Sequence, residues 1–290
     1  MKEKNAVLLL FLTSFIWGMT FVFQSQAADL IGPFMFNGIR MMIGFFVLLP
    51  FCFKSIKKNL AVNKNYLKEL IPRGLLCGVL LSFAAFFQQA GLSYTTAGKG
   101  AFITALYILF VPLFGIFTKD KPAPSAWVYA LMGLVGTYLM AVGKDSGINR
   151  GDIMVFICAF LYSFQIMAVN FGVKKVDPVD LSAAQMLFGG IICLTCGLLF
   201  EEFRLKMVSD ALISILYAGI FSCGIAYTLQ VVGQKYVKPE KASLVMCLES
   251  AWAALGSAII LGERMNSREL LGCLILFGSV VISSLPQHKS

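Results

Sequence analysis

The stretch AFFQQAGLSYTTAGKGAFITALYILFVPLFGIF, residues 85–117, decides the fold because its pattern recurs later in the chain. Five identical pairs lie at one offset of 142 residues: Gln88 and Gln230, Gly91 and Gly233, Tyr94 and Tyr236, Lys99 and Lys241, and Gly136 and Gly278. A recurrence of this length indicates that the chain contains two copies of one structural unit.

A second offset, of 145 residues, relates positions upstream of that stretch. It aligns Phe15 with Phe160, Trp17 with Tyr162, Pro33 with Pro178, Arg40 with Gln185, and Gly44 with Gly189. The three-residue difference falls in the loop after the second apolar segment, where an insertion or deletion is tolerated. We therefore predict a first repeat over residues 1–145 and a second over residues 146–290.

The composition is that of an integral membrane protein. Hydrophobic residues make up 58% of the chain and charged residues 13%, against about a quarter charged in soluble proteins, and the mean hydropathy is +0.81. The basic residues lie in short loops between apolar runs, so we expect no nucleic-acid partner. The first apolar run has no recognisable cleavage site and should remain in the mature chain.

Ten apolar segments are long enough to cross a bilayer, which takes roughly 20 helical residues. They cover residues 6–25, 32–53, 72–92, 97–117, 125–143, 151–172, 180–200, 209–233, 241–261 and 267–285. The longest gap, residues 54–71, is predicted to be a polar loop that carries several lysines.

The loop charges predict the orientation of these spans. Sixteen lysines and arginines lie on the side of the N-terminus and seven on the opposite side, so both termini should be cytoplasmic in a bacterial-type cytoplasmic membrane. Because each half holds five spans, an odd number, the second half must enter the membrane from the opposite side. The predicted fold is all-α, with ten transmembrane helices in two inverted five-helix repeats. Secondary transporters use this arrangement, with the substrate site between the repeats.

Glu249 is the only carboxylate well inside a predicted span. At that depth a carboxylate costs a few kcal/mol unless it is protonated or paired, so it should face a cavity, be protonated or bond to a neighbour. Cation or amine coordination, proton coupling and a structural hydrogen bond all fit. Its repeat mate at the 142-residue offset is Tyr107, which is polar but carries no charge.

Arg40 and Pro112 are the other unusual residues inside spans. Arg40 suits a substrate carboxylate, but pairing with backbone carbonyls or with lipid phosphate is the commoner role. Pro112 should kink the fourth helix. Kinks of this kind point to binding sites in transporters, although a static packing kink is more usual. We assign both residues a structural or coupling role.

Polar side chains follow one face of the third span and one face of the eighth. In the third span Ser82, Gln89 and Ser93 share this face with the ring of Phe86, and in the eighth span the face carries Tyr227, Gln230 and Gln234. At helical spacing these stripes should face each other or a wet cavity, and some of the amides serve as interhelical glue. Glutamine at one position in both copies, Gln88 and Gln230, favours a central location for that pair.

Four aromatic residues lie in the middle of spans rather than at the membrane interfaces, where such rings usually anchor. They are Trp17, Tyr107, Tyr162 and Trp252. We interpret them as candidate cavity walls that could stack on an apolar or cationic solute. Plain packing is the alternative for each of them.

Motifs for other activities are missing from the sequence. It has no G-x-x-x-x-G-K-[ST] loop for ATP. Its one histidine, His288, lies in the tail, which excludes histidine triads and zinc ligation within the membrane. The eight cysteines fall in or at the ends of apolar segments, where packing is the expected role. We expect no catalytic residues, no metal and no cofactor.

Four short motifs and the ten-span duplicated layout resemble the EamA-domain branch of the drug/metabolite transporter superfamily. The motifs are Ile16-Trp17-Gly18, Gly38-Ile39-Arg40, Leu248-Glu249-Ser250 and Leu261-Gly262-Glu263-Arg264. The resemblance implies a secondary transporter, often an exporter of amino acids, other metabolites or drugs. It also implies a cavity walled mainly by the third, fourth, eighth and ninth spans, and a structural role for Glu263. Many members place proline after the ninth-span glutamate, where this chain has Ser250.

The leading hypothesis is a proton-linked or facilitative carrier that exports a small organic solute by alternating access. The predicted solute-binding residues are Glu249, Gln89, Gln230, Tyr227, Trp17, Tyr107, Tyr162, Trp252, Gln88 and Phe86. Import or exchange of an amine is an alternative; a channel, or an intramembrane enzyme, which would need clustered acidic residues or metal ligands, is less favoured. The expected partners are the solute, protons and membrane lipid, for a monomer or homodimer.

Overall fold

The computed structural model describes residues 1–118, 121–141, 147–260 and 266–284, and all structural statements concern these residues. The described chain is helical and contains no strand. The predicted repeat boundary at residue 145 and the whole of the motif at 261–264 lie outside the described residues. The helices in the first half are α1 (Glu3–Ala27), α2 (Pro33–Val62), α3 (Tyr66–Leu92), α4 (Ala97–Thr104), α5 (Tyr107–Gly115) and α6 (Pro124–Ala141).

The second half repeats this order, with a short helix α9 added and its third span divided into three helices. Its helices are α7 (Arg150–Gly172), α8 (Pro178–Phe200), α9 (Leu205–Asp210), α10 (Leu212–Tyr217), the π-helix η1 (Ala218–Ala226), α11 (Tyr227–Gln234), α12 (Pro239–Met246), α13 (Glu249–Ile260) and α14 (Ser267–Ser284). Within the described residues, nine helices or continuous helix series are long and apolar enough to cross a membrane. The remaining predicted span, residues 125–143, coincides with the 18-residue helix α6.

Three of the predicted spans are not single α-helices. The fourth divides into α4 and α5, the ninth divides into α12 and α13, and the eighth runs from α10 through η1 into α11. The breaks in the fourth and ninth spans fall at residues 105–106 and 247–248, which correspond at the 142-residue offset. The two copies therefore share a broken helix at the same position.

The predicted polar loop at residues 54–71 is wrong. Helix α2 continues to Val62 and α3 begins at Tyr66, so most of this segment is helical. Hydropathy marks only the apolar part of a helix, and the lysine-rich turns are good helix formers. The buried carboxylate of Asp180 in α8 fixes both helices, because it accepts hydrogen bonds from Ser55, Asn59 and Tyr66.

Glycines at equivalent positions of the two repeats pack against equivalent helices of the opposite half. Gly91 of α3 lies against α7, where an added Cβ would come within 2.9 Å of the Gly151 carbonyl oxygen. Its repeat mate Gly233 lies against α1 in the same way, with Leu10 at 2.8 Å. Gly44 of α2 likewise packs on η1, while its mate Gly189 packs on α3. Each contact therefore has a counterpart between the opposite halves, as a two-fold relation requires.

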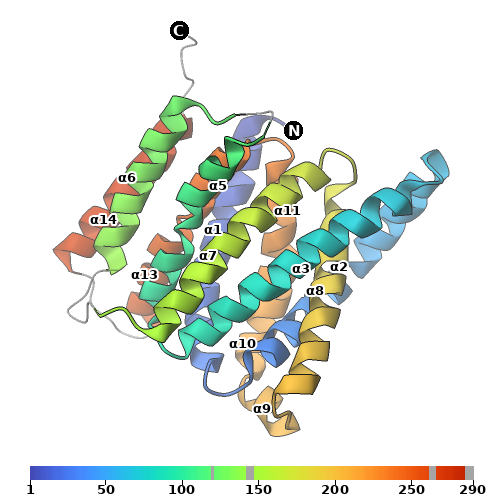
Figure 1. The fold of residues 1–290 in the computed structure, drawn as a ribbon, viewed down its shortest axis with the longest axis horizontal. Coiled ribbons are helices and arrows are strands. Elements are labelled where there is room, and N and C mark those ends of the chain that lie inside the picture. Colours follow the sequence, from blue (N-terminus) through green and yellow to red (C-terminus); the bar gives the residue numbers. More distant parts are fainter. Residues whose placement is uncertain (119–120, 142–146, 261–265, 285–290) are drawn as a thin grey trace.

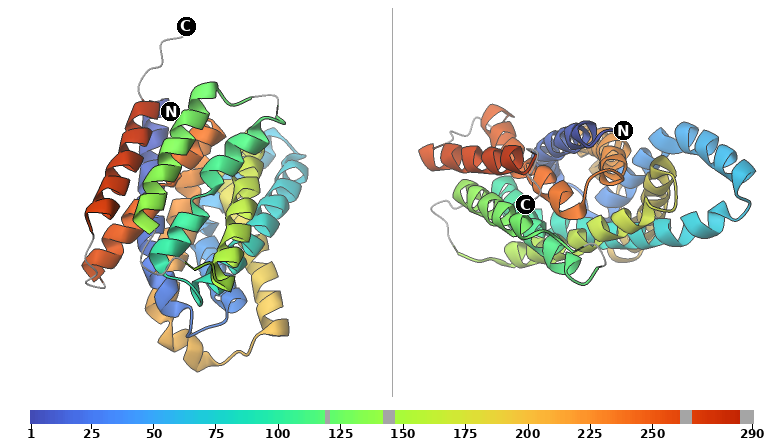
Figure 2. Two further views of the ribbon diagram at one scale, coloured as in Figure 1. Left: turned by 60° about the vertical axis from the view of Figure 1, so that its left-hand side comes forward. Right: turned by 90° about the horizontal axis from the view of Figure 1, so that it is seen from above.

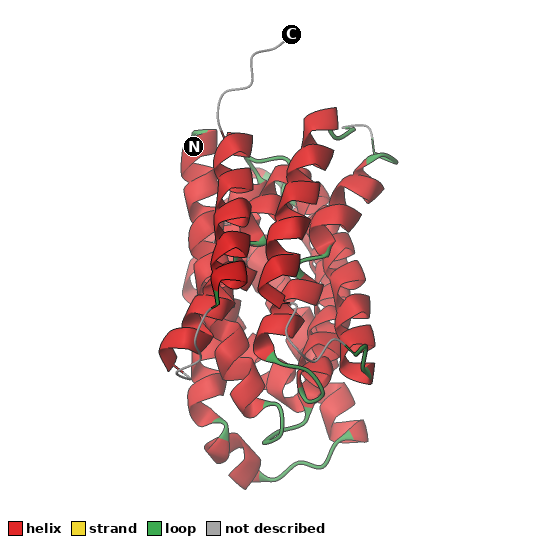
Figure 3. Cartoon of the chain, turned by 90° about the vertical axis from the view of Figure 1, so that its left-hand side faces the viewer, coloured by secondary structure: helices red, strands yellow, loops and turns green. Residues whose placement is uncertain are grey.

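The direction of the helices shows the inversion of the second copy. In Figure 1, α1 descends from the N-terminus while its counterpart α7 rises from the opposite end. The last helices of the two halves, α6 and α14, also run in opposite directions, and they lie side by side at one edge of the bundle (Figures 1 and 2). Helix α1 begins, and helix α14 ends, at the same end of the bundle (Figures 1 and 3). The two-repeat architecture is thus an inverted one.

The small residues of the fifth predicted span serve packing within the chain. An added Cβ at Gly136 of α6 would lie 2.8 Å from the carbonyl oxygen of Gly272 in α14, and the reverse substitution would be closer still. Backbone contact at this distance needs glycine on both helices. This surface therefore serves the close approach of α6 and α14 within the chain.

Candidate functional site

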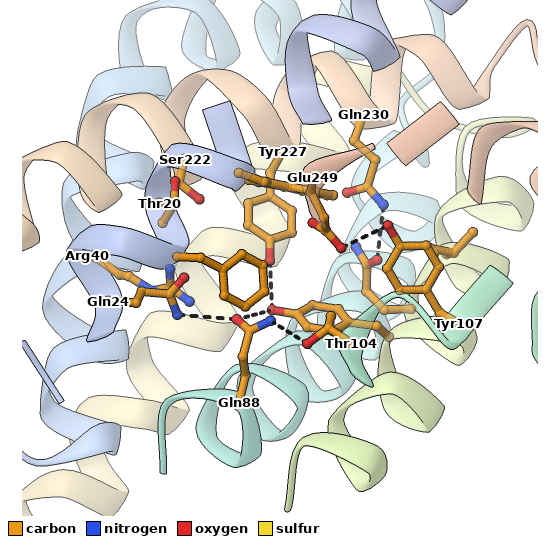
Figure 4. A pocket seen from close by; sticks show the side chains of 15 residues that line it. Thr20, Gln24, Arg40, Gln88, Thr104, Tyr107, Ser222, Tyr227, Gln230 and Glu249 are labelled. Carbon is orange, nitrogen blue, oxygen red and sulfur yellow. Dashed lines mark hydrogen bonds between the residues drawn. The ribbon is translucent and has the colours of Figure 1, made fainter. Parts of the chain in front are cut away.

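A cavity lies between the two halves, in the middle of the bundle (Figure 4). Its volume is about 30 Å³, which is room for about two water molecules. The lining side chains of the first half are Trp17, Thr20, Phe21, Gln24, Arg40, Gln88, Thr104 and Tyr107. Those of the second half are Tyr162, Gln165, Ile166, Ser222, Tyr227, Gln230 and Glu249.

The carboxylate of Glu249 lies at this cavity and is bound by its own repeat mate. The Tyr107 hydroxyl donates a hydrogen bond of 2.9 Å to Oε1 of Glu249. Two residues at equivalent positions of the repeats can be in contact only if both lie close to the two-fold axis that relates the repeats. The contact between Tyr107 and Glu249 therefore marks the centre of the site. Glu249 is 3% exposed, and it forms no ion pair with any described residue.

The breaks in the fourth and ninth spans determine where Tyr107 and Glu249 lie. Tyr107 is the first residue of α5 and Glu249 the first residue of α13, so each follows directly on the interruption of its span. At the second break the hydroxyl of Ser250 donates to the carbonyl oxygen of Cys247 at 2.8 Å. A serine thus satisfies a carbonyl at the interruption, and the ninth span is broken although it lacks the proline that many family members carry.

A glycine brings α1 against the second break. An added Cβ at Gly18 would lie 2.3 Å from Cβ of Trp252 and 2.7 Å from the backbone oxygen of Glu249. Only glycine allows this approach of the two backbones. It sets the cavity face of α1, with Trp17 and Thr20, beside the glutamate.

Aromatic residues cross the middle of the cavity. The hydroxyls of Tyr162 and Tyr227 are 3.0 Å apart and share a hydrogen bond. The ring of Trp17 packs on Tyr227 with centroids 4.8 Å apart, and its indole N–H has no hydrogen-bond partner among the described residues. These residues and Tyr107 therefore line the cavity.

Amide side chains link the first and third spans of each half. Gln24 in α1 donates to Gln89 in α3 at 3.0 Å, and Gln230 in α11 donates to Gln165 in α7 at 3.2 Å. The two pairs have the same separation of 65 residues along the chain. Gln88 accepts from Gln24 and donates to the Thr104 hydroxyl. Hydrocarbon could not supply these bonds, and among these amides the Oε1 of Gln230 is left without a described partner.

Arg40 lies at the side of the cavity away from Glu249 (Figure 4). Its Nε donates to Oδ1 of Asn37 at 2.8 Å, while its Nη2 has no partner in the described part of the chain. The Asn37 amide nitrogen in turn donates to the carbonyl oxygens of Pro33 and Ala85. Asn37 is thus fixed with its oxygen toward the guanidinium, which it orients without neutralising.

Three of the predicted solute-binding residues lie outside the cavity. Gln89 is buried, with both ends of its amide bonded to Gln24. Phe86 stacks on Phe34 with centroids 3.9 Å apart. Trp252 packs among aromatic rings that include Phe11. Helical spacing put Gln89 on the polar face of α3, whereas the match between the two copies favoured a central location for Gln88, which is the residue that lines the cavity.

Pro112 lies within α5, and the chain does not break at its ring. The interruption falls before it, at residues 105–106, where Ile108 N–H donates to the Ala105 carbonyl in a tightened turn. Because proline lacks the N–H that would bond the Ile108 carbonyl, its effect falls on the turn before it. The expected distortion of the fourth span is present, upstream of the proline.

Several lining residues were not predicted from the sequence. They are Thr20, Phe21, Gln24, Thr104, Gln165, Ile166 and Ser222. Gln24 and Gln165 carried a usable signal, because an amide inside an apolar span needs a partner. Neither residue is identical to the one at the equivalent position of the other copy, so the comparison of the two copies did not identify them.

One further expectation needs correction. The first and sixth spans, α1 and α7, supply seven of the lining residues, so the cavity is not walled mainly by the third, fourth, eighth and ninth spans. Packed side chains leave the cavity only about 30 Å³ in this conformation. Among the described residues no cluster of acidic, cysteine or histidine side chains could hold a metal ion.

Comparison with known proteins agrees with this architecture. The family model described as "EamA-like transporter family" matches residues 4–142 and again residues 149–285. An uncharacterized transporter of Archaeoglobus fulgidus is 28% identical over 98% of this chain and 87% of its own length. The uncharacterized transporter YoaV of Bacillus subtilis is 24% identical over 90% of each chain.

Two other proteins extend the comparison. The uncharacterized inner membrane transporter YicL of Salmonella typhimurium is 22% identical over 99% of this chain and 98% of its own length. A solved structure described only as "Crystal structure of protein" superposes with a TM-score of 0.76 at 20% identity, covering 98% of this chain and 97% of the other. That structure shares the fold. With two matches of the family model that together span nearly all its residues, the chain belongs to the EamA-like transporter family, within the drug/metabolite transporter superfamily.

Proposed function

We propose that this protein is a secondary transporter that exports a small organic solute by alternating access, with Glu249 as the central binding residue. The observation that carries the proposal is the Tyr107 to Glu249 hydrogen bond, which places a buried carboxylate beside the axis between the repeats. Carriers with inverted repeats bind their substrate at this position.

The closed cavity is consistent with a carrier between its two open states. Two nearly equivalent halves can exchange roles, so conformations open to either side lie close in energy. A cavity of about 30 Å³ would represent the occluded conformation, and a solute would enter when one end of the seam opens. A channel would instead need a continuous polar pore.

Coupling to protons is part of the proposal. A buried carboxylate with one hydroxyl donor can exchange a proton for a cationic group of the solute. A transporter embedded in a bacterial-type cytoplasmic membrane with both termini in the cytoplasm fits the distribution of loop charges. An enzyme is disfavoured because the family and the named relatives are transporters.

Efflux from proteoliposomes tests the function and identifies the solute in the same experiment. Vesicles loaded with a ¹³C-labelled bacterial metabolite extract should release specific compounds, identified by mass spectrometry. Glu249→Gln should lower that efflux about tenfold or more, or abolish its dependence on pH, because it removes the exchangeable charge and keeps the shape. Glu240→Gln, in the first turn of α12 and outside the cavity, is the matched control. Equal flux through wild type and Glu249→Gln at every pH would remove the glutamate from the mechanism.

A further inference from the structure

A second, larger cavity lies between α2, α3 and α8, and it shares no described lining residue with the central one. Its volume is about 490 Å³, within the range of about 300–1,000 Å³ that is usual for ligand-binding clefts. The lining side chains are apolar except for those of Lys57 and Asp180. Of the apolar ones, Leu49, Phe53 and Ile71 are 39%, 69% and 49% exposed. The cavity is therefore a groove that opens on the outer surface of the bundle.

This groove has the length of one membrane leaflet. On α2 its lining runs from Phe45 to Leu60, a rise of about 22 Å at 1.5 Å per residue. The hydrocarbon of one leaflet is about 15 Å deep, half of a core of about 30 Å. In Figure 1, α2 and α3 extend together beyond α8 at one edge of the bundle. The groove therefore runs from near the middle of the membrane to its surface, at the end of α2.

Positive charge surrounds the end of the groove at the membrane surface. The last turns of α2, the turn at residues 63–65 and the first turn of α3 carry five exposed lysines: Lys54, Lys57, Lys58, Lys64 and Lys68. None of them forms an ion pair with a described residue. The neighbouring carboxylate of Glu69 is already paired with Arg73. These lysines therefore give the end of the groove a net positive charge.

The acidic lining residue, Asp180, lies at the floor of the groove. It is fully buried, and its Oδ2 accepts hydrogen bonds from Ser55, Asn59 and Tyr66. Three donors thus compensate its charge within the protein. An anionic group would be repelled from the floor and attracted to the exposed lysines, so the groove favours a ligand with an apolar part inside and an anion at its end.

We propose that this groove binds an anionic phospholipid of the surrounding membrane, with an acyl chain along α2 and α8 and the phosphate among the lysines. Inside a bilayer an acyl chain gains little by exchanging other chains for apolar side chains, so the charge of the headgroup selects the lipid. A second copy of this chain is a poor occupant, because a two-fold contact at this face would bring two sets of the same lysines together.

Native mass spectrometry of the purified full-length protein tests the selection by charge. The probes are dioleoyl phosphatidylglycerol and dioleoyl phosphatidylcholine, which have the same chains and differ in net charge. One phosphatidylglycerol should bind at a concentration about tenfold or more below phosphatidylcholine, because each lysine near the membrane surface favours an anionic lipid about fivefold. Equal binding of the two lipids would overturn the proposal, and so would a protein dimer that binds neither.

A pair of lysine variants separates this groove from a general attraction to cytoplasmic charge. The double variant Lys54→Gln/Lys57→Gln should weaken phosphatidylglycerol binding about tenfold. Lys235→Gln/Lys238→Gln is the matched control, because it removes two exposed lysines from the same side of the bundle and neither lines the groove. The control should bind as wild type does. Equal weakening in both double variants would show diffuse attraction and overturn the proposal.

Filling the groove tests the place of the acyl chain. Ile71→Trp adds a large ring at the exposed mouth of the groove and should weaken phosphatidylglycerol binding about tenfold. Leu76→Trp, at a similarly exposed position of α3 that does not line the groove, should have no effect. Leu49→Trp blocks the groove from α2 and replaces Ile71→Trp if that variant does not fold. Unchanged binding in a folded groove variant would mean that the lysines alone hold the lipid, which would overturn the proposal.

Discussion

At the scale of single residues, the contact between Tyr107 and Glu249 joins the two copies at their most central point. Each residue faces the cavity because its span is broken just before it. One copy supplies a hydroxyl and the other a carboxylate, so a symmetric framework holds an asymmetric pair of functional groups. Charge at this position comes from one half only.

Substitution of Tyr107 by phenylalanine tests this pairing. The variant keeps the ring and removes the donor to a buried carboxylate, which should cost about 1–3 kcal/mol and change the pH dependence of transport. Tyr94→Phe is the matched control, because Tyr94 is 48% exposed and contributes its ring face to Arg150. Chemical denaturation in detergent measures the difference. Equal stability of the two variants would show that the hydrogen bond contributes nothing.

At the scale of helices, close backbone contacts hold the broken spans in place. Gly18→Ala should destabilise the protein by about 1–3 kcal/mol, because the new Cβ would meet Cβ of Trp252 and the backbone of Glu249. Transport should fall with it, since α1 would be pushed off the second break. Gly278→Ala, where nothing described lies within 4 Å, should be neutral or stabilising. The melting temperatures of the two variants measure this difference. An unchanged melting temperature in Gly18→Ala would contradict the claim that α1 needs glycine at this position to pack against the second break.

A repeated ion pair allows a second comparison between helices. The mates Lys99 and Lys241 each bridge to the first helix of the opposite half, to Asp152 at 2.6 Å and to Glu3 at 2.8 Å. Asp152 is buried and also accepts from Thr95, whereas the side chain of Glu3 is 57% exposed. Asp152→Asn should therefore cost about 3 kcal/mol and Glu3→Gln at most about 1. Denaturation curves that show the opposite order would contradict this interpretation.

The sequence predicted the duplicated helical fold because membrane spans and repeated residues are local patterns. It identified Glu249 and Gln230 because a charge or an amide inside an apolar span must be bonded or face a cavity. It identified Tyr107 as an aromatic residue in the middle of a span and as the repeat mate of Glu249. It missed the break at residues 247–248, where no proline marks the interruption. Helical spacing alone could not separate Gln88 from Gln89, because a helix rotation of one residue depends on packing across the seam; the shared position of Gln88 and Gln230 in the two copies pointed to Gln88, which lines the cavity.

At the scale of the molecule, the loop charges imply that both chain ends face the cytoplasm. A green fluorescent protein fused after Ser290 should therefore fluoresce in intact cells, because it folds only on that side. Alkaline phosphatase at the same position should be inactive, because it needs the oxidising side of the membrane. Active phosphatase with a dark fluorescent fusion would reverse the orientation and the expected direction of transport.

In the proposed mechanism, the inverted repeat provides two equivalent ways to open one central site. Contacts between the halves occur in matched sets, such as Gly44 on η1 and Gly189 on α3. Breaking one set while keeping its counterpart would open the seam at one end only. The central claim is that the cavity at Glu249 is exposed alternately to the two sides of the membrane.

Counterflow tests that claim most directly. A labelled solute identified by efflux is added outside proteoliposomes that contain the same unlabelled compound. We expect faster entry of label than into empty vesicles, a transient accumulation above the outside concentration, saturation with concentration, and loss of all three in Glu249→Gln. Entry that is insensitive to the internal solute and rises linearly with concentration would contradict alternating access.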